Sequence, residues 1–145
     1  MLVRPFTWLD LHAVATLCLE LGYPATTDEV RRRIESFGPS QYVIVAEDEL
    51  SKSILGWIEV QVISHVHGAR CLEICGLVVA SEHRGIGVGS HLVKAAEDLA
   101  GKEGLSKVWV RSNIVRDRAR GFYSRLGFRL VKTSNLFEKE FSAVQ

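Results

Sequence analysis

The sequence is poor in the residues that build disulfide scaffolds, and it lacks a run of apolar residues long enough to cross a membrane. Its 145 residues include three cysteines, Cys18, Cys71 and Cys75, with no Cys-x-x-Cys pair. Cys71 and Cys75, if they share a strand, lie about 13 Å apart, too far for a disulfide. We therefore expect reduced thiols. Because no apolar run approaches 18 residues and no signal peptide is present, we also expect a cytoplasmic protein.

The chain also lacks an excess of either charge. Its 18 basic and 17 acidic residues give a net charge of +1. These totals argue against nucleic acid or a membrane surface as partners. Arginines cluster between residues 111 and 129, where a solvated helix face and a phosphate-rich ligand are both consistent with the pattern. With 47% hydrophobic residues and no repeat, linker or low-complexity tract, residues 1–145 are expected to form a single domain with its own core.

Hydrophobic periodicity predicts an α/β (α+β) fold. Helices are expected between Thr7 and Gly22, between Thr26 and Gly38, from Ser90 to Ala100, and from Arg116 to Leu126. Strands are expected at Gln41–Glu47, Ile54–Ile63, Cys71–Val79, Lys107–Ser112, Phe128–Thr133 and Asn135–Phe141. The short polar turns between the early strands predict an antiparallel meander. We expect a mixed, mostly antiparallel central sheet with helices on both of its faces.

The most informative segment is Arg84-Gly-Ile-Gly-Val-Gly89, which links the predicted strand ending at Val79 to the predicted helix starting at Ser90. Glycines let backbone N–H groups approach an anion closely, and the start of a helix adds free N–H groups and partial positive charge. The segment therefore predicts a pyrophosphate site. A tight turn without a ligand is the alternative.

The spacing of the glycines distinguishes between the known types of phosphate-binding loop. A Walker loop ends in Gly-Lys-Ser/Thr, but here Gly89 is followed by Ser90 and His91. A dinucleotide fingerprint starting at Gly85 would need glycine or alanine where Ser90 stands. Arg/Gln-x-x-Gly-x-Gly/Ala fits, with Arg84, Gly87 and Gly89. This pattern resembles the coenzyme A pyrophosphate loop of the GNAT superfamily of N-acetyltransferases.

The resemblance continues on both sides of the loop. Ala119-Arg-Gly-Phe-Tyr-Ser-Arg-Leu-Gly-Phe128 resembles the second family signature, and Val3–Thr7 is similar to the first strand of the family. Two positions depart from it: Ser81 replaces a frequent proline, and Arg116 a frequent asparagine. The resemblance implies a GNAT-like sheet of about seven strands and acetyl-coenzyme A as cosubstrate, with no metal. The implied cofactor-binding residues are Leu77, Val78, Val79, Arg84, Gly85, Ile86, Gly87, Val88, Gly89, Ser90, Arg116, Ala119, Phe122 and Tyr123.

Two side chains are candidates for the chemistry. Tyr123 occupies the position at which the family points a phenol at the coenzyme sulfur, although Phe122 and Tyr123 are also consistent with simple aromatic packing. Glu73 stands in an apolar strand, and its position matches a general-base glutamate of histone-type members. Strict alternation would place Glu73 on the same face as Leu77 and Val79. Glu59 is the alternative base, and for either carboxylate the other interpretation is a solvent-facing residue at a strand edge.

The acceptor is expected to bind near the first two helices, roughly Trp8 to Phe37, by resemblance. Glu20, Tyr23 and Glu59 are the candidate acceptor-binding residues. The first hypothesis is acetylation of a small-molecule amine. Acetylation of a protein lysine or N-terminus and a non-catalytic coenzyme A sensor are the alternatives, and a homodimer is left open. His65 and His67 suggest no metal site because a third ligand at a useful spacing is missing.

Overall fold

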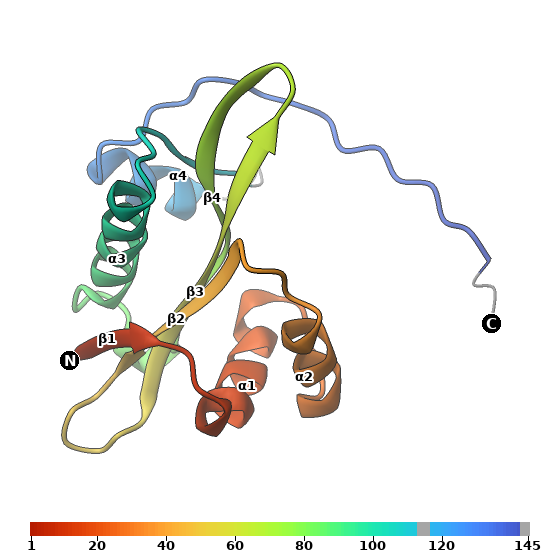
Figure 1. Cartoon of the computed structure of the whole chain (residues 1–145). Helices are drawn as coiled ribbons and strands as arrows, with labels where there is room; N and C mark the ends of the chain where they lie inside the picture. Colours follow the sequence, from red (N-terminus) through yellow and green to blue (C-terminus); the bar gives the residue numbers. More distant parts are fainter. Residues whose placement is uncertain (113–116, 143–145) are drawn as a thin grey trace. The chain divides into compact units, whose positions relative to one another are not determined.

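A computed structural model describes residues 1–112 and 117–142 (Figure 1). These residues form two compact units, Met1–Arg111 and Ser112–Gln145, which we describe separately. The single domain expected from the sequence stays a prediction. Within the described ranges, no helix has the length and apolar character needed to cross a membrane.

The first unit is built on a five-stranded sheet whose strands lie side by side in chain order. Neighbouring strands are antiparallel except for the last pair, which is parallel. The strands are β1 (Leu2–Pro5), β2 (Gln41–Glu47), β3 (Ile54–His65), β4 (Gly68–Val79) and β5 (Val108–Val110). β2 has the bounds predicted from the sequence. β3 and β4 are longer than predicted because their hairpin stays paired through polar residues as far as His65 and Gly68.

Capping residues set the helix bounds. The helices of this unit are the short 3-10 turns η1 (Trp8–Asp10) and η2 (Ser81–His83) and the helices α1 (Leu11–Leu21), α2 (Thr27–Glu35) and α3 (Val88–Lys102). Gly22 ends α1 in the left-handed conformation, with φ of 96°. Thr26 and Glu29 form the predicted capping box at the start of α2.

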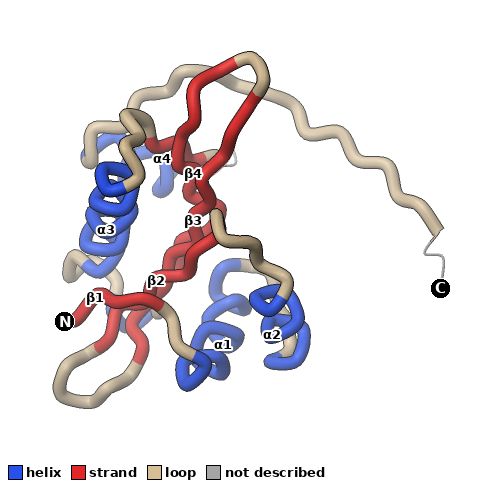
Figure 2. The backbone as a smooth tube through the Cα atoms, viewed as in Figure 1, coloured by secondary structure: helices blue, strands red, loops and turns tan. Residues whose placement is uncertain are grey.

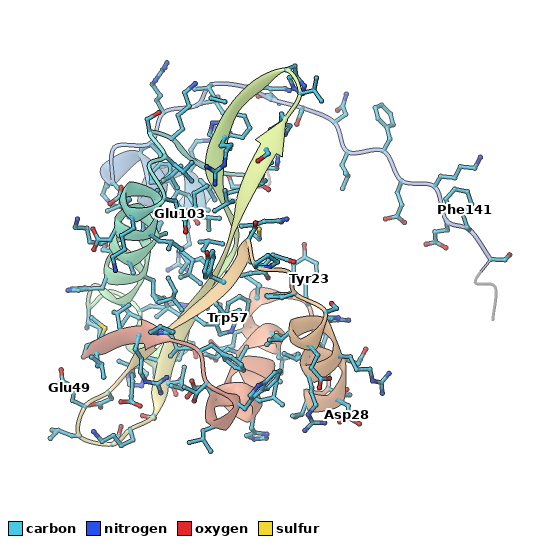
Figure 3. The ribbon with its side chains drawn as sticks, in the orientation of Figure 1. Tyr23, Asp28, Glu49, Trp57, Glu103 and Phe141 are labelled. Carbon is cyan, nitrogen blue, oxygen red and sulfur yellow. The ribbon has the colours of Figure 1, made fainter. Side chains whose placement is uncertain are left out.

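The helices cover both faces of the sheet, as Figure 2 shows: α1 and α2 lie on one face and α3 on the other. On the α1 face, Trp57 is buried between the sheet and α1, and its Nε1 donates a hydrogen bond to the Val14 carbonyl oxygen at 3.2 Å (Figure 3). On the α3 face, Ile58 and Leu92 are fully buried. The predicted fold class is confirmed.

The second unit contains α4 (Asp117–Arg125) followed by a turn at Gly127. Residues 128–142 form neither helix nor strand, so the two strands predicted at Phe128–Thr133 and Asn135–Phe141 are wrong. The sheet formed by the described residues therefore has five strands, where about seven were expected. A β-strand is held by hydrogen bonds to a neighbour, and no described strand pairs with this segment. Its large apolar side chains stay exposed, among them Leu130, Leu136, Phe137 and Phe141.

Candidate functional site

The site begins where β4 continues beyond the end of its pairing with β5. The two strands pair only at Leu72, Glu73 and Ile74 of β4, opposite Val108–Val110. β4 continues to Val79, and within residues 1–112 and 117–142 no strand pairs with its last five residues on that side. A strand edge left open in this way presents unpaired N–H and C=O groups. The predicted cofactor-binding residues Leu77, Val78 and Val79 belong to this open edge.

The glycine loop follows directly and leads into α3. Gly85 and Gly87 adopt left-handed φ values of 84° and 93°, and Gly87 is the residue that precedes α3. A Cβ at Gly85 would meet no atom within 4 Å. The backbone conformation, and not crowding, therefore explains the glycine there, because a left-handed conformation costs other residues about 1–2 kcal/mol. The predicted strand, turn and helix are all present around the loop.

The loop offers backbone donors to a ligand. Val88, Gly89 and Ser90 open α3, where N–H groups have no partner in the preceding turn. None of the hydrogen bonds formed by the described residues uses an N–H group between Gly85 and Ser90. The buried Val88 side chain fixes the helix start in the core. These donors, at the positive end of a helix dipole, fit a pyrophosphate.

Two side chains flank the loop. The Arg84 Nε donates a hydrogen bond to the Val79 carbonyl oxygen at 3.2 Å, and the Arg84 guanidinium lies 3.9 Å from the Glu20 carboxylate. The His91 Nδ1 lies 2.7 Å from the Gly87 carbonyl oxygen, so the His91 ring contacts the glycine loop. Glu20, expected to meet the acceptor, instead contacts the loop. Its role in acceptor binding stays a prediction.

A β-bulge changes the face on which Glu73 lies. Glu59 of β3 is opposite Gly76, and the next residue, Val60, is opposite Ile74, so Cys75 is an extra residue in β4. Glu73 therefore shares a face with Gly76. The expectation that Glu73 lies with Leu77 and Val79 is wrong because strict alternation does not allow for the inserted residue.

The shared face is the one covered by α1. A Cβ at Gly76 would lie 3.3 Å from the Trp57 ring and 3.8 Å from Leu21 of α1. Glu73 and Glu59 therefore face the side of the sheet on which acceptor binding is expected. Glycine at position 76 leaves room for the Trp57 ring, which packs against α1 through its bond to Val14.

The two carboxylates on this face have different surroundings. Glu73 accepts a hydrogen bond from the Arg111 Nε at 2.8 Å, which also forms an ion pair. Glu59 is half-buried, and burial alone raises the pKa of its carboxyl group. Burial and the charges of Glu59 and Glu73 raise the pKa of the Cys75 thiol to about 11. Burial therefore makes the Glu59 carboxylate more basic than an ordinary glutamate, and Glu73 is the candidate base that is paired with Arg111.

Tyr123 lies on α4 in the second unit. Burial raises the pKa of Tyr123 to about 12, so the phenol is protonated at neutral pH. Its ring centroid lies 5.0 Å from that of Phe122 and 5.4 Å from that of Phe128. The Phe128 N–H donates to the Tyr123 carbonyl oxygen at 3.0 Å across Gly127, whose φ is 92°. This Schellman-type helix end explains the Tyr-x-x-x-Gly-Phe spacing of the sequence.

The remaining predicted residues occupy varied positions. Ala119 and Phe122 are half-buried on the same helix face as Tyr123. Tyr23 follows the end of α1, and 68% of its surface is exposed (Figure 3). Arg116 lies outside the described residues. No group of three or more His, Cys, Asp or Glu side chains in the described ranges is arranged to hold a metal ion.

Sequence reasoning missed two features of this site. Arg111 was counted only as a member of an arginine cluster, and its pairing with Glu73 depends on the parallel register of β4 and β5. The bulge at Cys75 was also missed, although Gly76 gave a signal. Glycine inside an otherwise apolar strand often marks a bulge or the close approach of a neighbouring group.

Comparison with protein families agrees with the family resemblance that the sequence motifs showed. The model of the acetyltransferase (GNAT) family matches residues 8–128, which include the glycine loop and Tyr123. The comparison with curated proteins gives no match.

Solved structures share the fold over almost the whole chain. A transcriptional regulator from Bacillus halodurans C-125 is 25% identical, with 95% of this chain and 99% of that chain covered and a TM-score of 0.83. An aminoglycoside 6'-N-acetyltransferase from Acinetobacter haemolyticus is 16% identical, with 98% and 100% covered and a TM-score of 0.83. A ribosomal-protein-alanine N-acetyltransferase from Brucella melitensis is 17% identical, with 96% and 100% covered and a TM-score of 0.78. At these identities, the last two show the fold alone.

Proposed function

This chain belongs to the GNAT family of acetyltransferases, and from that membership we propose that it acetylates a primary amine of a small molecule by direct attack in a ternary complex. Acetyl-coenzyme A supplies the acetyl group. The observation that carries the proposal is the glycine loop at the start of α3, with its unused N–H groups, directly after the open edge of β4. Together these features suit a long cofactor with a pyrophosphate in its middle.

Cofactor binding is assigned to backbone groups. The N–H groups from Gly85 to Ser90 would hold the pyrophosphate, and Arg84 would add positive charge. The open edge formed by Leu77, Val78 and Val79 would pair with the amide groups of the pantetheine arm, as an added strand does. Both contacts use the backbone, so they require a fixed loop more than particular side chains.

Deprotonation of the acceptor amine is assigned to Glu59, directly or through water, with Glu73 as the alternative. A general base needs a free lone pair and a pKa near the working pH. The Arg111 Nε already uses one oxygen of Glu73, whereas burial raises the pKa of Glu59. This reverses the order of preference that the sequence suggested, and both residues stay candidates.

Protonation of the departing thiolate is assigned to Tyr123. Its pKa of about 12 keeps the phenol protonated over the physiological range, so it can donate a proton or a hydrogen bond. Its ring is held by Phe122 and Phe128, and a fixed ring favours a defined direction for the hydroxyl. Aromatic packing and proton donation are therefore compatible roles for Tyr123.

Small amines are the preferred acceptor class because two carboxylates, Glu59 and Glu73, lie on the α1 face of the sheet and would attract an ammonium group. The likeness to the aminoglycoside enzyme from Acinetobacter agrees with this choice. The likeness to the Brucella enzyme favours a protein substrate, and that to the Bacillus regulator favours a sensor. A cytoplasmic location and a homodimer stay predictions.

One experiment separates these functions. The protein is incubated with acetyl-coenzyme A and a panel of aminoglycosides, polyamines, aryl amines and lysine-containing or free N-terminal peptides, and thiol release is measured. Release with small amines alone is expected. Release with peptides alone would support protein acetylation, and calorimetric binding of coenzyme A without release would support the sensor. Absence of coenzyme A binding would overturn the assignment of the glycine loop as a pyrophosphate site.

A further inference from the structure

The Glu20 carboxylate joins the last turn of α1 to the turn that begins the cofactor loop. One of its oxygens accepts a hydrogen bond from the Ser81 N–H at 2.9 Å. The other lies 3.3 Å from the Ser81 hydroxyl, whose single proton is shared with the Glu82 carboxylate at 3.2 Å. The first oxygen also lies 3.9 Å from the Arg84 guanidinium. All of these groups are partly exposed. Glu20 and Ser81 are 61 residues apart, so the contact is tertiary.

Glu20 is poorly placed for the helix that carries it. The last turn of a helix has partial negative charge, which disfavours a carboxylate there. α1 has no basic residue in this turn to offset the effect. The partners of Glu20 therefore come from the turn at Ser81 and from Arg84. The contacts with Ser81 and Arg84 therefore offset the helix stability that a carboxylate costs at this position.

The turn is held from two sides. The Ala80 N–H donates to the Leu55 carbonyl oxygen at 2.8 Å, which fixes the turn to the sheet, and Glu20 fixes the next residue, Ser81, to α1. Arg84 is in turn held by the Val79 carbonyl oxygen and by the charge of Glu20. The start of the loop thus has its direction set before any ligand binds.

We propose that Glu20 is a positioning residue for the coenzyme A pyrophosphate, which holds the Ser81 turn and the Arg84 guanidinium in their binding arrangement. The proposal rests on the proposed function, since it takes the loop to bind coenzyme A. A carboxylate near a pyrophosphate also repels it. That repulsion is screened at a partly exposed site, whereas the bond from the Ser81 N–H is charge-assisted and is 2.9 Å long, so positioning dominates.

Three variants separate the bonds of Glu20 from its charge. Glu20→Ala removes both. Glu20→Gln keeps an oxygen that accepts from the Ser81 N–H but removes the charge. Ser81→Pro removes the donors and leaves Glu20 intact. Proline suits the first position of a helical turn, and the preceding Ala80, with ψ of 137°, has the backbone that proline requires. Glu35→Ala is the matched control because Glu35 is an exposed carboxylate that ends α2.

The first measurement uses the protein without ligand. In Glu20→Ala, the Ser81 amide should exchange with solvent at least about tenfold faster by NMR, while the amides of α3 keep their rates and the melting temperature stays within a few degrees. Glu35→Ala should leave the Ser81 amide unchanged. Unchanged protection of Ser81 in Glu20→Ala would overturn the proposal without reference to any cofactor.

The second measurement is the dissociation constant for coenzyme A by calorimetry. We expect a three- to tenfold increase in Glu20→Ala and in Ser81→Pro, no further increase in the double variant, and a change within twofold in Glu20→Gln and Glu35→Ala. Unchanged or tighter binding by a folded Glu20→Ala protein would overturn the role of Glu20 alone. Failure of the wild-type protein to bind coenzyme A would instead overturn the proposed function.

Discussion

Arg111 and Glu73 form an ion pair, with the Nε of Arg111 2.8 Å from Glu73 Oε1. Arg111 directly follows the end of β5, whereas β4 continues to Val79 paired with β3 alone, so the pair joins β4 and β5 beside the end of their ladder. It also occupies one oxygen of the carboxylate that the sequence first suggested as the base. Glu59, on the same face, accepts no side-chain hydrogen bond from the residues that the structure describes, and burial raises the pKa of its carboxyl group.

We predict that Glu59→Gln lowers kcat/KM at neutral pH by about 10²-fold, the lower end for a positioned base. The raised pKa of Glu59 means that the carboxylate takes up a proton at a higher pH than an ordinary glutamate, so the wild-type rate should fall as pH falls through that value. This dependence should disappear from the pH–rate profile of the variant. Glu73→Gln is the comparison. If it removes the dependence and Glu59→Gln does not, the base is Glu73.

Gly87→Val should weaken coenzyme A binding at least tenfold, or about 1.4 kcal/mol. Gly87 has a φ of 93°, which valine adopts only with strain, so the variant should shift the N–H groups of the loop. The matched control is Gly104→Val, at a φ of 72° after α3, where a Cβ meets no atom within 4 Å; at Gly87 a Cβ makes only ordinary contact with the His91 ring, 3.6 Å away. Calorimetry should show weaker binding in the first variant only. Equal affinities of the two folded variants for coenzyme A would argue against the glycine loop as its binding site.

Tyr123→Phe removes one hydroxyl and keeps the ring, so the packing against Phe122 and Phe128 should survive. We expect kcat to fall by about 10²-fold, with little change in the dissociation constant of acetyl-coenzyme A. Because the pKa of Tyr123 is about 12, the phenol should not cause a loss of wild-type activity between pH 7 and pH 10. Turnover within twofold of wild type, under conditions where chemistry limits the rate, would leave Tyr123 only a packing role.

Arg4 of β1 forms an ion pair with the buried Asp10 of η1, and we expect this pair to dominate acid stability. Arg4 donates to both oxygens of Asp10 at 2.8 and 2.9 Å, and these bonds lower the pKa of Asp10 below 3.8. A lowered pKa in the folded state stabilises the protein above the unfolded value, and this contribution is lost as pH falls through the folded value. Arg4 keeps its bond to Glu47 at 2.8 Å when Asp10 is removed, so Asp10→Ala should reduce the free energy of unfolding at pH 7 by about 1.5–3 kcal/mol, the range for hydrogen bonds to charged groups.

The measurement for Asp10 is urea unfolding at a series of pH values. The difference between wild type and Asp10→Ala should be constant above about pH 4 and should narrow below it. Asp98→Ala, which removes an exposed pair with Lys94, should cost less than about 1 kcal/mol and serves as the control. A difference that persists unchanged at pH 2 would contradict the ion-pair explanation.

Local signals predicted much of the fold, because caps and glycines act within a few residues. Thr26 and Glu29 predicted the start of α2, and Gly22 the end of α1. Tertiary pairing was harder. The strands predicted after Gly127 are missing because alternation of polar and apolar residues does not supply a neighbouring strand. The partner of Glu73 was missed because it depends on the register between strands that lie far apart in the chain.

The bulge makes β4 one residue longer than its ladder with β3 requires. Every neighbour of Cys75 keeps a partner without it: Ile74 pairs with Val60, and Gly76 with Glu59. Loss of one codon at position 75 would therefore leave the strand register intact and restore a regular pleat. Loss of a codon between positions 76 and 79 would instead draw Cys75 into the ladder and move it, with any residues between it and the deletion, by one place. Cys75 is thus a position in this strand where the gene can change length without changing which side chains face the two helical layers.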